Sequence, residues 1–137
     1  MVKYIGENNY EHGSKEKTGV LITNLGTPDE PNSQALKIYL KEFLSDTRVI
    51  EIPKFFWQII LHLIILRIRP RRSAKNYQSI WTKKGSPLLN ISKEQIYLLE
   101  KKLKASYPNT IFELGMRYGN PSIESALKKM QEEKVRR

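Results

Sequence analysis

Two short apolar runs in the sequence have the pattern of β-strands. The first covers residues 19–25 and ends at a Gly-Thr-Pro-Asp turn, and the second covers residues 110–118. Both are nearly continuous in hydrophobicity and contain β-branched or aromatic residues, which is typical of strands buried on both faces of a parallel sheet. The sequence therefore predicts two strands with helices packed on either side.

Helical periodicity predicts further elements between and after these strands. Apolar residues recur at helical spacing in three segments: Leu36, Tyr39, Leu40, Phe43 and Leu44; Ile96, Leu99 and Leu103; and Ile123, Ala126, Leu127 and Met130. Ser92 and Gln95 have the spacing of a capping box, which predicts that the second of these helices begins there and ends near residues 107–109. Asn120 and Pro121 predict the cap and first residue of the third.

Residues 55–68 are apolar on every side of a predicted helix. Pro53 opens this helix, Pro70 is expected to stop it, and residues 73–81 then form a short separate helix. The apolar stretch includes His62 and Arg67 and falls short of the roughly 18–20 residues needed to cross a bilayer. A helix of this kind is either buried in a core or in contact with a non-aqueous surface.

The order of these elements indicates an incomplete domain. Two strands that need parallel neighbours, followed by a helix that leads to no third strand, predict the first part of a larger α/β protein. Residues 1–17 are polar, contain no targeting signal and are expected to form a flexible tail. Residues 18–137 are assigned to the α/β domain.

Composition excludes several kinds of chemistry. The chain contains no cysteine and two histidines, so we expect no disulfide, no thiolate nucleophile and no thiolate metal centre. We find no Ser/His/Asp set and no zinc-binding motif. The residues alone therefore predict no catalytic group and no metal ligand.

Positive charge dominates the chain and is concentrated in one segment. Lysine and arginine exceed aspartate and glutamate by 24 to 14, a net charge of +10, and residues 67–84 contain seven bases and no acid. This run could hold an anionic ligand or membrane surface, or it could be a solvated basic loop. Tyr77 and Trp81 lie among these basic residues, as aromatic residues do in proteins that bind single-stranded nucleic acid. No nucleic-acid-binding signature is present, however, and we expect no nucleic acid to bind.

The turns that follow the two strands are candidate ligand sites. Parallel strands place ligands at their carboxyl ends, where residues 24–28 and 118–122 would lie side by side and line one cleft. No glycine-rich nucleotide motif is present. The alternative is that these two segments are ordinary strand-to-helix turns that bind no ligand.

Several blocks of this sequence together resemble the amino-terminal part of bacterial ferrochelatases. The similar blocks are residues 20–28, 39–46, 48–53, 85–89 and 116–122, in the order found in that family. The resemblance implies a protein of two Rossmann-like α/β domains, each a parallel sheet flanked by helices, of which this chain is part of the first. It also implies insertion of ferrous iron into a distorted porphyrin during heme synthesis.

The resemblance further implies where the reaction's functional residues lie. The family's proton-abstracting histidine and glutamate fall downstream of residue 137, and neither His12 nor His62 is in a matching motif, so no catalytic residue is assigned in this chain. Iron is a substrate whose ligands are expected in the missing part, and no prosthetic group is expected. The porphyrin-binding residues transferred by resemblance are Asn24, Leu25, Gly26, Arg71, Arg72, Tyr77, Ser86, Arg117 and Tyr118.

Leu25 and the apolar segment Phe55–Ile68 refine this expectation. Relatives of the coproporphyrin-using type have a tyrosine where Leu25 stands, so the resemblance favours protoporphyrin IX. An apolar segment next to a basic one also suits an anionic membrane surface, so we expect a cytoplasmic protein in which this segment packs in the core or, as the second alternative, contacts a membrane peripherally. The alternative is a non-catalytic basic α/β module that binds an anionic ligand or a membrane.

Overall fold

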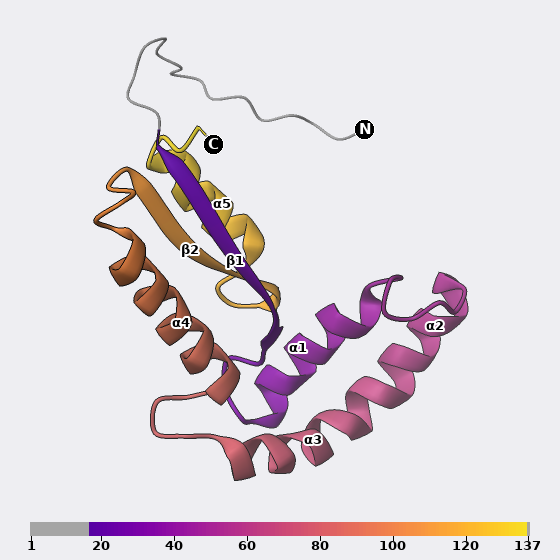
Figure 1. The fold of residues 1–137 in the computed structure, drawn as a ribbon. Helices are drawn as coiled ribbons and strands as arrows, with labels where there is room; N and C mark the ends of the chain where they lie inside the picture. Colours follow the sequence, from indigo (N-terminus) through magenta and orange to yellow (C-terminus); the bar gives the residue numbers. More distant parts are fainter. Residues whose placement is uncertain (1–16, 137) are drawn as a thin grey trace.

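The computed structural model describes residues 17–136. The elements in chain order are β1 (Thr18–Thr27), α1 (Ser33–Ser45), α2 (Lys54–Ile60), a π-helical turn η1 (Leu61–Ile65), α3 (Leu66–Ile80), α4 (Pro87–Leu103), β2 (Thr110–Gly119) and α5 (Ile123–Glu132). The strands form one layer beside α4 and α5, and α1 with the long α2–α3 helix forms a second group next to the strand ends (Figure 1).

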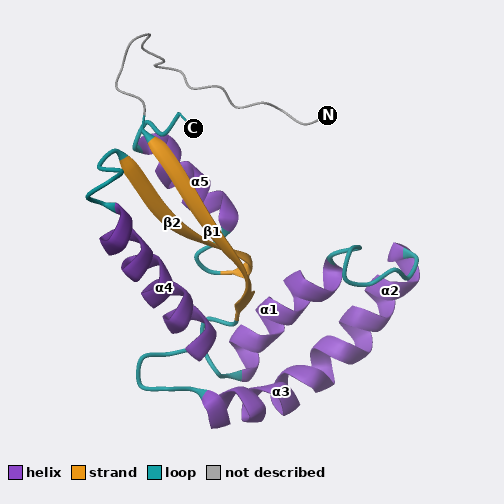
Figure 2. Ribbon diagram, in the orientation of Figure 1, coloured by secondary structure: helices purple, strands orange, loops and turns teal. Residues whose placement is uncertain are grey.

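The two strands pair directly and in parallel. Their register runs from Thr18 opposite Thr110 to Thr27 opposite Gly119, and the arrangement confirms the predicted α/β fold with a parallel sheet (Figure 2). One face of β2 presents Phe112, Leu114 and Met116, which pack with Ile96 of α4. The opposite face meets α5, where a Cβ added at Gly115 would lie 2.9 Å from the Cα of Ile123.

Burial differs between the strands, which corrects the expectation that both are enclosed. β2 is largely buried, whereas most of β1 is half-buried or exposed. The difference arises because α4 packs on both strands, whereas α5 and α1 pack mainly on β2.

A second apolar cluster joins the helices to the sheet. Leu40 and Leu44 of α1 pack with Leu61 and Leu66, and Tyr118 of β2 completes the cluster. Leu61 is fully buried. This cluster therefore fixes the α2–α3 helix against α1 and both against the end of β2.

The prediction that Pro70 ends a helix is wrong. α3 passes through Pro70 and continues to Ile80, so residues 73–80 belong to it rather than to a separate helix. The preceding turn is π-helical, and a new α-helical stretch begins only at Leu66. Pro70 removes the hydrogen bond to the carbonyl of Leu66, and the π-helical turn directly before Leu66 already departs from the regular α-helical hydrogen-bond pattern there.

Two predicted helix starts also need correction. α4 begins at Pro87 after the extended residue Ser86, so Ser92 lies within the helix and its hydroxyl donates to the carbonyl of Leu88 (2.8 Å) instead of capping. Proline at the first helical position accounts for the earlier start. α5 begins at Ile123, because Ser122 rather than Asn120 is the cap and accepts from the N–H of Ser125 (3.1 Å).

Most of the expected flexible tail, residues 1–16, lies outside the described residues. Lys17, assigned to that tail, instead forms a parallel bridge with Val135. Its ammonium group lies 3.0 Å from the Glu133 carboxylate. Lys17 is therefore joined to the segment around the end of α5.

Candidate functional site

The two predicted turns lie together at the carboxyl ends of the strands, as the sequence indicated. Gly26 is opposite Tyr118 in the sheet register. Beyond the strands, the side-chain amide of Asn120 donates to both carboxylate oxygens of Asp29 (3.2 and 3.0 Å). This contact joins the turn after β1 to the turn after β2.

Asn24 has a structural role at this edge. Its side-chain oxygen accepts from the N–H of Leu25 (2.8 Å), and its amide donates to the hydroxyl of Ser92 in α4 (3.1 Å). Leu25 itself is 49% exposed at the end of β1. Of the residues predicted on this turn, Leu25 is therefore the one that offers an accessible apolar side chain.

Tyr39 supports the same turn from α1. Its buried hydroxyl donates to the carbonyl of Gly26 (3.3 Å), and its ring stacks on Phe43. Burial raises the pKa of Tyr39 from 10.0 to about 12, with smaller contributions from the negative charges that Tyr77, Tyr118 and Glu42 carry when ionised. The phenol therefore stays protonated and able to donate up to strongly alkaline pH.

This raised pKa predicts an alkaline loss of stability. The unfolded chain releases the Tyr39 proton near pH 10.0 and the folded chain near pH 12, so the stabilisation is complete below pH 10 and is lost as the pH rises toward 12. We expect the urea midpoint to fall more steeply over this range for the parent chain than for Tyr39→Phe. Tyr97→Phe, at an exposed position, is the control, and equal slopes for all three chains would contradict the assignment.

Arg117 and Tyr118 converge on one carboxylate. Asp46, the residue after α1, lies 2.5 Å from the Arg117 guanidinium and accepts from the Tyr118 hydroxyl (3.0 Å). Hydrogen bonds from the N–H and side chain of Arg48 and from Arg117 hold the pKa of Asp46 well below its usual value, and Asp46 raises the pKa of Arg117. These groups share a pocket of about 650 Å³.

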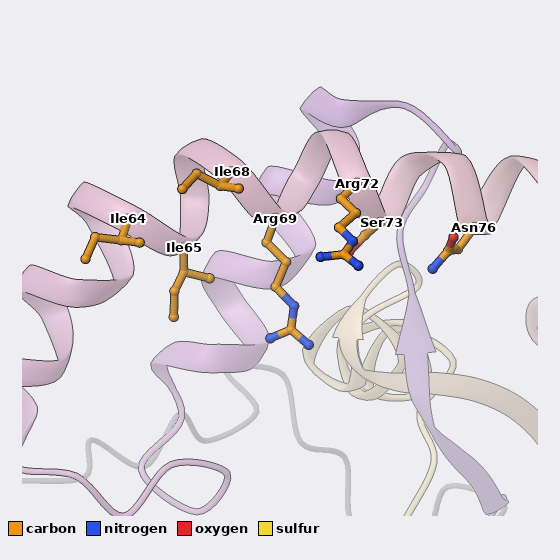
Figure 3. Close-up of a pocket in the computed structure, with 7 residues that line it drawn as sticks. All are labelled: Ile64, Ile65, Ile68, Arg69, Arg72, Ser73 and Asn76. Carbon is orange, nitrogen blue, oxygen red and sulfur yellow. The ribbon is translucent and has the colours of Figure 1, made fainter.

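A second pocket, of about 490 Å³, lies along the α2–α3 helix. Figure 3 shows its lining side chains, which come from Ile64, Ile65, Ile68, Arg69, Arg72, Ser73 and Asn76. Ile65, Arg69, Arg72 and Asn76 recur at helical spacing on one face. The pocket thus combines apolar side chains with two guanidinium groups.

Of the remaining predicted residues, Arg72 alone lines one of these two pockets. Arg72 lines the smaller pocket, whereas Arg71 is exposed and outside its lining. Tyr77 is half-buried, close enough to Tyr39 to influence its pKa, and its ring lies 6.4 Å from that of Trp81. Ser86 is 4% exposed and precedes α4.

The apolar segment Phe55–Ile68 is exposed over most of its length, so the core-packing interpretation is wrong for most of its residues. The exposed members are Phe55, Phe56, Ile59, Ile60, Leu63, Ile64 and Ile68, which we call the apolar patch. Leu61 and Leu66 are buried, and Trp57 and Ile65 are partly buried. Within residues 17–136, no helix is both long and apolar enough to cross a membrane.

Sequence reasoning missed three residues that the structure places at these pockets. Asp46 belongs to one of the ferrochelatase-like blocks, but the sequence assigns it no role although it binds Arg117. Arg71 is among the predicted residues on α3, whereas Arg69, which is not, lines the pocket. Glu42, which accepts from the N–H of Gly119 (2.9 Å), is not predicted either. The helical spacing from Arg69 to Arg72 was the signal available for one of them. Within the described chain, no three His, Cys, Asp or Glu side chains are grouped as a metal site.

Together, the fold and site define a class: an α/β protein with apolar and cationic side chains at its strand ends and on the neighbouring helix. Comparison with known proteins places it more closely. The sequence model of the ferrochelatase family matches residues 17–137. This chain belongs to the ferrochelatase family.

Curated relatives show the same relationship over part of their length. The chain is 54% identical to a ferrochelatase of Chromobacterium violaceum, covering all of this chain and 38% of that protein. It is 53% identical to one of Thioalkalivibrio sulfidiphilus and 48% identical to one of Idiomarina loihiensis, covering 99% of this chain and 37% and 38% of those proteins. The chain thus spans less than two-fifths of the length of these three relatives.

Proposed function

We propose that this chain binds protoporphyrin IX for the insertion of ferrous iron, which yields protoheme in heme biosynthesis. The observation that carries the proposal is the pocket on α3, where Ile64, Ile65 and Ile68 adjoin Arg69 and Arg72. Membership of the ferrochelatase family supports it.

The pocket suits the chemistry of a porphyrin. The macrocycle is flat and apolar and carries two propionates, so it needs apolar contacts next to cationic groups. A guanidinium matches a carboxylate with two parallel hydrogen bonds, and Arg69 and Arg72 supply two such groups beside three isoleucines. Leu25 cannot coordinate a metal and supplies apolar contact at the strand ends.

Binding can also contribute to the reaction itself. Metal insertion requires a porphyrin whose pyrrole nitrogens are accessible, and contacts remote from those nitrogens can supply the free energy that holds the ring in a distorted shape. We assign this holding role to α3 and to the strand ends with Leu25, Arg117 and Tyr118. Proton removal is assigned to groups other than those of residues 17–136.

A porphyrin titration tests the binding proposal. We expect protoporphyrin IX to shift its Soret band on addition of the chain, and Arg69→Ala or Arg72→Ala to weaken the affinity roughly ten-fold, because each removes charge-assisted hydrogen bonds. Arg71→Ala is the matched control on the same helix, outside the pocket, and is expected to have a smaller effect. An unchanged spectrum, or equal loss in all three variants, would contradict the proposal.

An iron-insertion assay tests the division of roles. The chain alone is expected to bind porphyrin without forming protoheme above the rate in buffer. The only histidine within residues 17–136, His62, is exposed on η1 rather than at the strand ends. Protoheme formation by the chain at the rate of a complete ferrochelatase would show that proton removal takes place within it.

We further propose a peripheral contact between the apolar patch and the cytoplasmic surface of an anionic membrane. Phe55 and Phe56 are 73% and 63% exposed, and the basic run at residues 67–84 follows the patch in sequence. Apolar burial and attraction to anionic lipid would act together. A membrane contact would also bring the α3 pocket close to a bilayer, into which poorly soluble porphyrins partition.

Vesicle sedimentation tests this contact. We expect the chain to sediment with vesicles containing phosphatidylserine, and Phe55→Ser/Phe56→Ser to reduce the bound fraction several-fold through loss of buried apolar area. Ile91→Ser, at an exposed apolar position on α4, is the control. Equal sedimentation of the two variants would contradict a contact through the patch.

A further inference from the structure

Arg117 and Tyr118 depend on a carboxylate that has no assigned role. The side chain of Asp46 is only 10% exposed, although those of its partners Arg48 and Arg117 are 76% and 43% exposed. Its carboxylate accepts five hydrogen bonds: from the backbone N–H, Nε and Nη2 of Arg48, from Nη2 of Arg117 and from the hydroxyl of Tyr118. Asp46 is thus the central acceptor of this group.

The backbone around Asp46 is itself fixed. Asp46 ends α1 in an extended conformation, and its carbonyl accepts from the N–H groups of Val49 (3.0 Å) and Ile50 (3.2 Å). Leu44, two residues earlier, is buried in the cluster that includes Tyr118. The carboxylate therefore projects from a backbone whose position relative to β2 is set by packing and by a turn.

The geometry leaves much of Arg117 available. A guanidinium has five N–H donors in a rigid plane, and the contact with Asp46 uses Nη2. The Arg117 guanidinium carbon also lies 5.3 Å from the Tyr118 ring centroid. The remaining N–H donors belong to a half-exposed guanidinium whose orientation is set by Asp46 and by the Tyr118 ring.

From these contacts we infer that Asp46 is a positioning residue: it holds the Arg117 guanidinium and the Tyr118 hydroxyl in one arrangement toward a bound porphyrin. The inference rests on the proposed function. Arg48 holds the opposite edge of the carboxylate through its N–H (2.9 Å) and Nε (3.1 Å). Asp46 itself needs no contact with the ligand.

Side-chain NMR of Arg117 tests the holding role without any ligand. In the parent chain we expect slow rotation about the Nε–Cζ bond and resolved Nη signals, because the ion pair restrains the group. In Asp46→Asn, which keeps the size but removes the charge, these signals are expected to average. Averaged Arg117 signals in the parent chain, or no difference between the two chains, would overturn the inference.

Two further variants separate positioning from folding. Asp46→Glu retains the charge one methylene farther out, so we expect it to fold and to restrain Arg117 partially even if Asp46→Asn does not fold. Asp29→Asn changes another carboxylate at the strand ends, one that binds Asn120 rather than Arg117, and should leave the Arg117 signals unchanged. An equal effect of Asp29→Asn would show a general loss of order and overturn the inference.

Porphyrin affinity completes the test through a double-mutant cycle. We expect Asp46→Asn to weaken protoporphyrin binding roughly five-fold in the parent chain, to have a smaller effect in Arg117→Ala and to have no further effect in Arg117→Ala/Tyr118→Phe, because Asp46 acts through these two side chains. Additive losses would overturn the inference. If the parent chain binds no protoporphyrin, the proposed function fails, and the Arg117 signals alone decide whether Asp46 restrains that side chain.

Discussion

Gly26→Ala is expected to disrupt the candidate site more severely than any substitution described above. Gly26 has a φ of +110°, and a Cβ at this position would lie 1.8 Å from the carbonyl oxygen of Tyr118, where real contacts are not shorter than 3.0 Å. The obstacle is backbone in the neighbouring strand, so it cannot rotate away as a side chain would. We expect a loss of about 4 kcal/mol or more in the free energy of unfolding, measured by urea titration.

Gly85→Ala provides a matched control for this prediction. Gly85 has a similar φ of +102°, but no atom lies within 4 Å of the position a Cβ would take. Its replacement therefore incurs backbone strain alone, about 1–2 kcal/mol. Equal losses in the two variants would show that strain, not the contact between the ends of β1 and β2, explains the effect at Gly26.

Leu61→Ala is expected to release the α2–α3 helix from α1. Leu61 is 0% exposed and packs in the cluster with Leu40, Leu44 and Tyr118, so its truncation removes apolar contact and leaves a cavity. We expect a loss of about 3–4 kcal/mol in urea unfolding. Because the α3 pocket follows directly in the same helix, porphyrin affinity should fall with it.

Leu63→Ala is the corresponding control. It makes the same chemical change two residues later, at a side chain that is 54% exposed. We expect a change within about 0.5 kcal/mol. A comparable loss at Leu63 would mean that the apolar patch is packed against other residues and is not available to a membrane.

The sequence predicted the strands well because their signal is local. The expected residues 19–25 and 110–118 fall within Thr18–Thr27 and Thr110–Gly119, since short apolar runs bounded by turns leave few alternatives. Helix boundaries were predicted less well. Proline signals both a helix start and a stop, and the correct reading of Pro70 depended on the π-helical turn before it, which the sequence pattern does not show.

The candidate site was predictable only where strand order alone defined it. Parallel pairing brought Leu25 and Gly26 beside Arg117 and Tyr118, as the turns indicated. Asp46 escaped notice because it lies 71 positions before Arg117 in the sequence and meets it only through the packing of α1. The sequence did not determine whether the apolar patch is exposed. A helix that is apolar on every side has no polar face to indicate which side packs against the core.

Mapping the protoporphyrin contact by NMR tests the central claim most directly. On titration of protoporphyrin IX into the isotope-labelled chain, we expect amide shifts in residues 24–26, 69–76 and 117–119, which surround the strand ends and the α3 pocket. Residues 124–132 belong to α5, which packs on the face of β2 opposite α4. Their amide signals should change little. Amide shifts confined to α5, or no shifts at saturating porphyrin, would show that the strand ends and the α3 pocket do not form a porphyrin-binding surface.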